Sequence, residues 1–210
     1  MTSTVTTAAI QALSISISLL ASGGIAAISL FDVPELQSQP ASRSLPATRW
    51  LFSRGSHVLP QAASLAGAGF LYLACAALPS TTTTMGGRLL SMLHVGTNGA
   101  VVNGYLGAAA LSAAIAPFTV FVMLPTTNSA LISLSAEKGG ARSAGDSVAG
   151  KGGASELTDL SGPQTRAQAS TEEDDEKVRA LLDKLGKLNL VRAFLLGAGG
   201  VLGLWTALLG

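Results

Sequence analysis

Long apolar stretches alternate with polar segments along the chain, and four of the stretches are long enough to be membrane spans. They occupy residues 7–31, 58–78, 104–124 and 188–209. Each approaches the roughly 20 apolar residues that a helix needs to cross a ~30 Å hydrocarbon core. Glycine is frequent in all four, as transmembrane helices tolerate. The pattern predicts an all-α fold for residues 1–210: one membrane domain, a four-helix transmembrane bundle with a long disordered loop before its last helix.

The first span carries a stripe of polar side chains along one face. At 100° per residue the members of the stripe fall within about 80° of one another; they are Gln11, Ser14, Ser18, Ser22 and Ser29. Such a stripe faces protein or a cavity rather than lipid. Two interpretations stay open, since the serines either pack helix against helix or form one wall of a polar pocket. No basic residue precedes this span, so we expect a retained helix rather than a signal peptide.

The third span meets an abrupt polar step at Pro125-Thr126-Thr127-Asn128. Proline disfavours helical backbone in the residue before it, and Thr and Asn can satisfy the backbone groups that are freed. The step therefore predicts the end of the third span and a short interfacial helix from about Ser129. The segment at 79–103 is ambiguous, and both a loop and an early start of the third helix are compatible with it.

Residues 135–175 differ in composition from the rest of the chain. Gly, Ser, Ala and Thr dominate, so the segment cannot bury enough apolar area to offset the entropy of ordering it. We expect a flexible loop here. It leads to the acidic residues 172–176 and then to an amphipathic pattern in which Leu181, Leu182, Leu185 and Leu188 share one side. The last span is therefore expected to extend out of the membrane as an amphipathic helix.

Composition supports a membrane protein, because only 12% of the residues are charged and 48% are hydrophobic. Soluble domains average about 25% charged residues. Apart from Arg88 and Arg192, every Lys, Arg, Asp and Glu lies at 32–54 or 137–187. The positive-inside rule then places these two segments in the cytoplasm and both termini on the opposite side of an intracellular membrane. No cluster of basic and aromatic residues supports binding to nucleic acid.

The usual catalytic signatures are missing from the sequence. It contains no GxSxG, P-loop or HExxH motif, and its two histidines and single cysteine do not make a convincing metal site. Any chemistry must therefore be done by His, Asn, Arg, Ser, Thr, Tyr and Trp side chains.

Two blocks of sequence nevertheless carry a resemblance to a known family. The first is Pro117-Phe118-Thr119, followed by Met123-Leu124-Pro125-Thr126-Thr127-Asn128 and Leu131. The second is Leu188-Asn189-Leu190-Val191-Arg192, with a glycine-rich span that ends Gly203-Leu204-Trp205. Upstream, Trp50, Gly55 and Pro60 complete the pattern. In this order the motifs resemble the fungal anthrone oxygenase family, small four-span membrane proteins of polyketide pathways.

The resemblance implies an oxidoreductase, an anthrone monooxygenase that oxidises a polyketide-derived anthrone to an anthraquinone with dioxygen and without metal or flavin. Its partners would be the hydrophobic polycyclic substrate, dioxygen, the lipid bilayer and other enzymes of secondary metabolite biosynthesis. The alternative is a non-catalytic membrane scaffold or a carrier for hydrophobic metabolites. An enzyme needs an apolar slot, a base and donors for the anionic oxygen around one cavity.

Candidate residues for these tasks follow from their side-chain chemistry. His57 is the first candidate base, and His94 is the second candidate base and an expected substrate contact. Arg192 and Asn128 are candidates for stabilising the oxyanion, with Asn189 three residues before Arg192 on the same helical face. Trp50 and Tyr105 are expected to stack on a flat ligand. Each has a structural alternative: an interfacial histidine or tryptophan, a snorkelling arginine, or an asparagine that closes a helix end.

Overall fold

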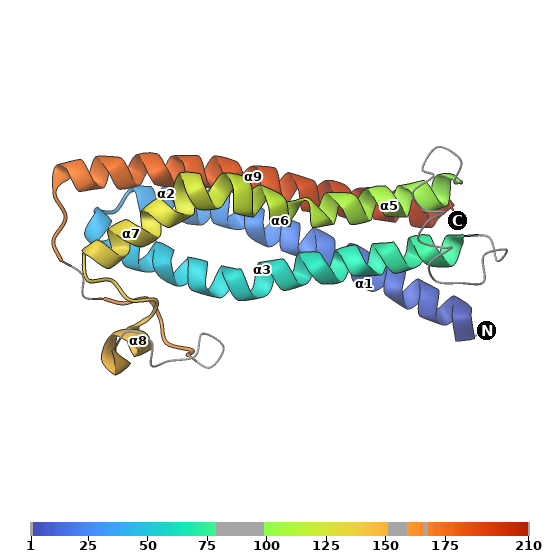
Figure 1. Cartoon of the computed structure of the whole chain (residues 1–210), viewed down its shortest axis with the longest axis horizontal. Helices are drawn as coiled ribbons and strands as arrows, with labels where there is room; N and C mark the ends of the chain where they lie inside the picture. Colours follow the sequence, from blue (N-terminus) through green and yellow to red (C-terminus); the bar gives the residue numbers. More distant parts are fainter. Residues whose placement is uncertain (1, 79–98, 151–158, 166–167, 210) are drawn as a thin grey trace. The chain divides into compact units, whose positions relative to one another are not determined.

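The computed structural model describes residues 2–78, 99–150, 159–165 and 168–209, and all regular structure in these ranges is helical. The chain order, drawn in Figure 1, is α1 (Thr2–Ala27), η1 (Ile28–Asp32), α2 (Val33–Gln37), α3 (Ala41–Ala77), α5 (Ala100–Ala113), α6 (Ile115–Phe118), η2 (Thr119–Asn128), α7 (Ser129–Glu137), α8 (Ala144–Ala149) and α9 (Glu172–Leu209). The segments η1 and η2 are π-helical. The predicted all-α class is confirmed.

Four helices are long and apolar enough to cross a membrane, as the sequence pattern predicts. They cover Thr4–Gln37, Ala41–Ala77, Ala100–Glu137 and Glu172–Leu209, which makes each of them 34 to 38 residues long. Each helix is therefore longer than the roughly 20 residues that a bilayer needs and extends past the predicted span. For α9 this extension was predicted. At the other flanks the polar residues were expected to leave the helix, but apolar residues recur there at helical spacing and keep one face buried.

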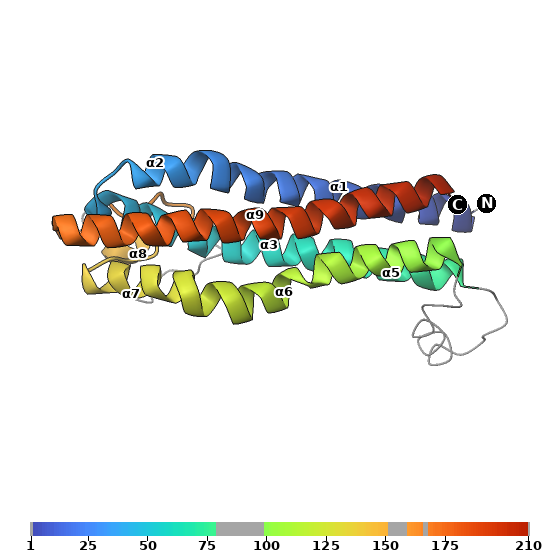
Figure 2. The ribbon, with the colours of Figure 1, turned by 90° about the horizontal axis from the view of Figure 1, so that it is seen from above.

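The largest such correction concerns residues 32–57, which we expected to be a loop. They form α2, a short turn and the first half of α3. The turn is held by the side chain of Asp175, whose Oδ1 accepts a hydrogen bond of 2.6 Å from the Ala41 amide. The Gln37 side chain also donates to the Arg179 carbonyl at 3.1 Å, and Figure 2 shows α2 beside the first turns of α9.

The chain divides into two compact units. Unit 1 comprises residues 1–24, 61–116 and 192–210. Its sequence contains no charged residue other than Arg88 and Arg192, and its α9 portion is roughly 27 Å long at 1.5 Å per residue. Large apolar side chains such as Leu20, Phe194 and Leu208 are more than 70% exposed. Unit 1 thus has the apolar surface and the helix length that suit a bilayer.

The interior of unit 1 contains the polar stripe of α1. The Ser18 and Ser22 hydroxyls each donate at 2.7 Å to α9, to the Leu196 and Ala193 carbonyls respectively. The Gln11 amide donates to the Tyr105 hydroxyl at 2.7 Å. Packing of helix against helix is therefore the interpretation that the structure supports for these stripe positions in unit 1.

Glycines let the helices of unit 1 approach one another closely. A Cβ added to Gly200 would lie 2.8 Å from a Leu19 methyl carbon, and one added to Gly107 would lie 2.9 Å from a Leu202 methyl carbon. A Cβ on Gly203 would enter the Phe70 ring. The Gly199–Gly203 spacing therefore acts as a packing motif, as its sequence indicates.

Unit 2 comprises residues 25–60 and 117–191 and contains nearly all of the charge of the chain. Its core is a cluster of buried apolar side chains from α2, α3, η2, α7 and α9: Val33, Leu36, Ala41, Leu45, Met123, Leu131, Leu134, Val178, Leu182 and Leu185. Near its acidic start α9 is joined to α7 by an ion pair of 2.7 Å between Lys138 and Asp174. Unit 2 therefore has a conventional apolar core with charged residues around it.

The Pro125 step does not end a helix, so this prediction is wrong. Residues 119–128 continue as a π-helix that contains Pro125 and leads directly into α7. Two threonines after the proline return hydrogen bonds to the preceding turn: Thr126 Oγ1 donates to the Val122 carbonyl at 2.5 Å and Thr127 Oγ1 to the Met123 carbonyl at 3.1 Å. Side-chain donors thus replace backbone donors around the proline, and the helix continues.

The predicted loop at 135–175 contains more regular structure than expected in the part that the structure describes. Its ends belong to α7 and α9, and α8 lies within it. Beyond α7, the Gln164 side chain accepts a hydrogen bond of 2.5 Å from the Ala141 amide. Residues 151–158 and 166–167 lie outside the described ranges, and the flexibility of the loop stays a prediction. Of the ambiguous segment at 79–103, the last residues begin α5, and 79–98 are not described.

Candidate functional site

Trp50, Arg54 and His57 lie on one face of α3, because they are spaced by four and three residues. The Trp50 indole N–H donates to the Ser161 carbonyl at 2.9 Å. The Arg54 guanidinium carbon lies 5.8 Å from the centre of the Trp50 ring, and its Nη2 donates to the same carbonyl at 3.5 Å. The segment around Ser161 thus covers this face of α3 at Trp50 and Arg54.

His57 follows one turn after Ser53 and bonds to it. Its Nδ1 lies 2.8 Å from the Ser53 carbonyl oxygen and 3.2 Å from the Ser56 hydroxyl oxygen. A carbonyl oxygen can only accept, so in a neutral imidazole this contact requires the proton to be on Nδ1. The contact fixes the orientation of the ring on its own helix.

The segment over Trp50 is held by a small hydrogen-bonded cluster. The Ser143 hydroxyl caps the start of α8 by accepting from the Asp146 amide at 3.0 Å, and it donates to the Asp159 carboxylate. The Ser161 amide donates to Asp159 at 2.9 Å. These bonds, chiefly the one from Ser143, lower the pKa of Asp159 to about 2. Asp159 is therefore ionised at any physiological pH and organises this part of the chain.

Asn128 ends the π-helical segment and is half-buried. Its side-chain oxygen accepts a hydrogen bond of 3.0 Å from the Thr127 hydroxyl. Thr127 itself is fully buried and lies on the stripe of Met123 and Leu131 that faces the core of unit 2. The Thr127 side chain therefore faces the apolar core of unit 2, and the Asn128 side chain lies next to it.

Asn189 and Arg192 are both on α9, which is continuous from Glu172 to Leu209. Asn189 is 6% exposed and extends the buried stripe of Leu182 and Leu185 in unit 2. Arg192 is half-buried and begins the α9 portion of unit 1. A side-chain amide is rarely buried on the same helical face as core leucines unless it forms hydrogen bonds.

Two predicted substrate contacts remain, Tyr105 and His94. Tyr105 is a buried core residue of unit 1 that accepts from Gln11, so its ring packs against protein. His94 lies outside the described residues. Unit 2 therefore contains His57, Trp50, Asn128 and Asn189, whereas Tyr105 and Arg192 belong to unit 1. The roles of all these residues toward a substrate stay predictions.

Sequence reasoning missed a set of buried hydroxyls in unit 2. Ser44, Thr48 and Ser135 are at most 2% exposed, and their hydroxyl oxygens have no hydrogen-bond partner among the described residues. The Thr119 hydroxyl oxygen is in the same position. The spacing of Ser44 and Thr48 could have revealed them as one helical face, but residues 32–57 were expected to be a loop, and a loop has no faces.

No group of three or more His, Cys, Asp or Glu side chains in the described ranges is placed to hold a metal ion. The candidate side chains of unit 2 instead carry imidazole, amide and hydroxyl groups. An imidazole can accept a proton, and amide and hydroxyl groups can donate hydrogen bonds to an anionic oxygen.

In fold class the chain is a four-helix membrane protein, with helices long and apolar enough to span a bilayer and polar side chains turned inward. A family model described as anthrone oxygenase matches residues 49–202. The match covers well over half of the chain, and the protein belongs to the anthrone oxygenase family. Neither the curated proteins nor the solved structures that were compared gave a match.

Proposed function

We propose that this protein oxidises a polyketide-derived anthrone to the corresponding anthraquinone with dioxygen. The family match over residues 49–202 carries the proposal, because it includes the first motif block, Leu188–Arg192 of the second block and every predicted site residue. The family implies an oxygenase, and the polar groups of unit 2 supply functions that anthrone chemistry requires.

The reaction is balanced with dioxygen as the sole oxidant. A base removes a proton from the CH₂ carbon opposite the ketone, which gives an electron-rich enolate. The enolate passes one electron to dioxygen, and the resulting carbon radical and superoxide combine to a hydroperoxide after protonation. Loss of water from this hydroperoxide breaks the O–O bond and the remaining C–H bond and leaves the second ketone. The overall change is anthrone plus O₂ to anthraquinone plus H₂O.

His57 is the proposed base, since its Nδ1 contact with Ser53 leaves Nε2 as the basic nitrogen. Arg192 and Asn128 are proposed to stabilise the negative charge that develops on the ketone oxygen. Asn189, Trp50, Tyr105 and His94 are proposed substrate contacts. For Trp50 the contact with Ser161 and Arg54 means that the substrate approaches a ring that is already oriented.

A membrane protein is a suitable host for this reaction, because a flat polycyclic substrate and dioxygen both partition into apolar surroundings. The positive-inside rule favours an orientation with the basic segments of unit 2 in the cytoplasm, and we propose an intracellular membrane as the location. There the enzyme would receive its substrate from other enzymes of the same polyketide pathway.

The decisive experiment incubates membranes that contain the full chain with emodin anthrone under air and follows quinone absorbance. We expect quinone formation above the rate of empty membranes, with one O₂ consumed per quinone, and loss of the excess rate in His57→Ala and Arg192→Ala. A rate equal to that of empty membranes would contradict the proposal and favour a scaffold or a carrier. Quinone binding without turnover would point to the carrier.

A further inference from the structure

Exposed apolar side chains continue from unit 1 into unit 2. Within the four spans, the large apolar side chains that unit 2 exposes form one set, which we call the apolar band: Leu30, Phe31, Val58, Val120, Phe121, Leu124, Leu190 and Val191. Phe31 is 71%, Val58 63% and Phe121 76% exposed. Two further exposed apolar residues of unit 2, Val148 and Leu160, lie outside the spans. Water-facing surfaces rarely expose this much apolar area, so the apolar band indicates a surface that is covered.

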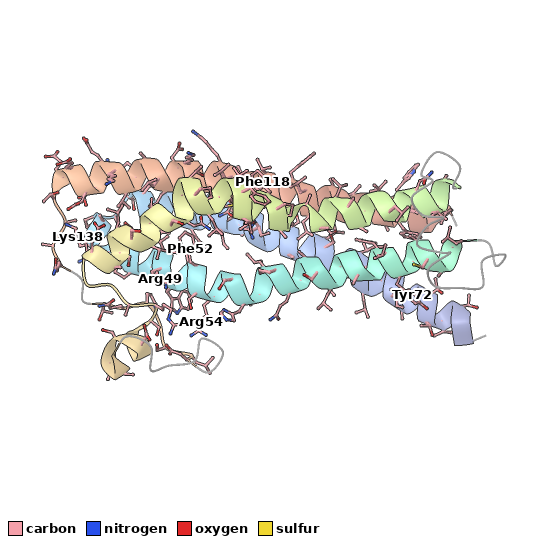
Figure 3. All side chains as sticks on the ribbon, viewed as in Figure 1. Arg49, Phe52, Arg54, Tyr72, Phe118 and Lys138 are labelled. Atoms are coloured by element: carbon pink, nitrogen blue, oxygen red, sulfur yellow. The ribbon has the colours of Figure 1, made fainter. Side chains whose placement is uncertain are left out.

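Polar side chains follow directly beyond the apolar band on every span. The first exposed polar residues there are Asp32, Ser56, Ser129 and Lys187. Two of these transitions lie at the same level, because a Cβ added to Gly186 would lie 3.2 Å from a Val33 methyl carbon. In Figure 3 the labelled charged residues of unit 2, Lys138, Arg49 and Arg54, lie displaced from Phe118 toward the end of α7. The surface of unit 2 thus changes from apolar to polar over a short distance.

The lengths of two spans agree with a membrane edge at this level. Residues 58–77 of α3 and 190–209 of α9 run from the apolar band to the far end of each helix. Each stretch has about 20 residues and is about 30 Å long, which is the thickness of a hydrocarbon core. An edge further into unit 2 would place the exposed charges of Asp32 and Lys187 among acyl chains, which is costly.

We propose that lipid acyl chains cover the apolar band, so that the edge of the hydrocarbon core crosses unit 2 between this band and the first exposed polar residues. All four spans contribute exposed apolar side chains. Lipid surrounds a protein on all sides, whereas a protein partner covers one face. Along α3 and α9, which are continuous helices, the band also follows directly on the apolar residues of unit 1. The inference is independent of the reaction that the protein catalyses.

The position of this edge sets the depth of the candidate site in the membrane. His57 and Asn189 each directly precede a residue of the apolar band, and Asn128 lies about one turn beyond Leu124. The imidazole and the two amides are therefore at the depth where acyl chains meet headgroups. Combined with the proposed function, on which this step rests, an anthrone dissolved among the acyl chains reaches these groups without first entering water.

Spin labels measure this depth without any substrate. Cys75→Ala removes the single native cysteine, and Phe31→Cys, Phe121→Cys and Val191→Cys each place one nitroxide on the apolar band. The labelled full-length protein is reconstituted into phosphatidylcholine vesicles. Relaxation of the nitroxide is then measured with dioxygen, which concentrates among acyl chains, and with a water-soluble nickel chelate. At all three positions we expect the dioxygen effect to exceed the nickel effect.

Glu35→Cys and Lys187→Cys are the matched controls, because each lies four residues from a labelled band position and is exposed. The ratio of the dioxygen effect to the nickel effect should be several-fold higher at Phe31 than at Glu35, and at Val191 than at Lys187. The five substituted side chains are exposed, so folding should tolerate them, and thermal unfolding in detergent checks each variant.

Three results would overturn the inference. Low access of both reagents at the band positions would show that protein, such as a second copy of the chain, covers the band. High nickel access there would show that the band faces water, and a dominant dioxygen effect at both controls would place the edge further into unit 2. The expected profile without any quinone formation would remove the proposed function alone. Quinone formation with one of the three contrary profiles would remove this inference alone.

Discussion

The Nδ1 atom of His57 lies 2.8 Å from the carbonyl oxygen of Ser53, one turn earlier in α3. The helix that contains the imidazole therefore also fixes its tautomer. A backbone acceptor cannot be removed by substitution of Ser53, so this arrangement depends on the helix itself rather than on a neighbouring side chain. The orientation of the imidazole is therefore set within one turn of its own helix.

His57→Asn should abolish most of the anthrone oxidation rate, with kcat reduced about 10²- to 10⁴-fold, the typical contribution of a general base. The measurement is the initial rate of quinone formation in membranes with matched protein levels. Ser53→Ala leaves the carbonyl acceptor in place and should retain the wild-type rate. A His57→Asn protein with wild-type kcat would remove His57 from the mechanism.

Arg192→Lys should reduce kcat more than KM, because the positive charge stays but the planar, bidentate donor geometry is lost. A decrease in kcat of about tenfold or more is expected if the guanidinium stabilises the anionic oxygen. Arg179→Lys serves as the control, since Arg179 is an exposed residue that bonds to the Gln37 carbonyl at 3.3 Å. Equal kinetic behaviour of the two variants would indicate that Arg192 only anchors the helix at the membrane surface.

Two glycine substitutions in unit 1 should have opposite effects on stability. Gly203→Ala places a methyl group inside the space of the Phe70 ring and should cost about 1–3 kcal/mol through overpacking. Gly24→Ala meets no atom within 4 Å and should raise helix stability by roughly 0.5–1 kcal/mol. Thermal unfolding of the two purified variants in the same detergent gives the comparison, and a Gly203→Ala protein as stable as Gly24→Ala would contradict the packing described.

Protonation of Asp159 should release the segment around Ser161 in acid. Its pKa is lowered to about 2 in the folded protein, chiefly by the Ser143 hydroxyl, whereas an unfolded aspartate titrates near 4. A lowered folded pKa means that the stabilisation is complete above about pH 4 and is lost as the pH falls toward 2. Amide hydrogen exchange of residues 159–165, measured from pH 5 to pH 2.5, should show falling protection once intrinsic rates are corrected.

Ser143→Ala should make this pH-dependent loss smaller and complete at a higher pH, because removal of the main donor raises the pKa of Asp159 in the folded protein toward its unfolded value. Asp183→Asn changes an exposed carboxylate that pairs with Lys187 at 2.7 Å and should leave protection at 159–165 unchanged. Protection that is independent of pH in the wild-type protein would show that Asp159 does not hold this segment.

The sequence predicts the number and type of helices because apolar length is a local property that each span expresses separately. It also identifies the serine stripe of α1, since a stripe follows from helical periodicity. Helix ends are a different matter. Arg43, Arg49 and Arg54 made residues 32–57 resemble a loop, yet Ala41, Leu45 and Leu51 continue an apolar face that packs in unit 2. Such a face stabilises a helix only when it packs against other elements of the protein.

The candidate site could be predicted only in part for the same reason. His57, Asn128 and Asn189 attract attention by residue type, and no knowledge of the fold is needed to select them. Ser44 and Thr48 do not stand out by residue type. Only the structure shows that their hydroxyl groups are buried and form no hydrogen bond to the carbonyl one turn earlier. Trp50 was expected to stack on a ligand. In the structure it contacts Arg54, four residues away, and Ser161, 111 residues away. A local sequence pattern cannot reveal the second contact.

The π-helical segment from Thr119 to Asn128 has a consequence for insertions and deletions. An α-helical residue turns the chain by about 100°, and the wider π turns advance it by less, so this segment sets the rotational phase of α7 relative to α6. Deleting one residue here would rotate Leu131 and Leu134 by a large angle out of the core of unit 2. The length of this segment is therefore as constrained as its composition, and two proteins that share its residues but differ by one position in length would present different faces of α7 to the same interior.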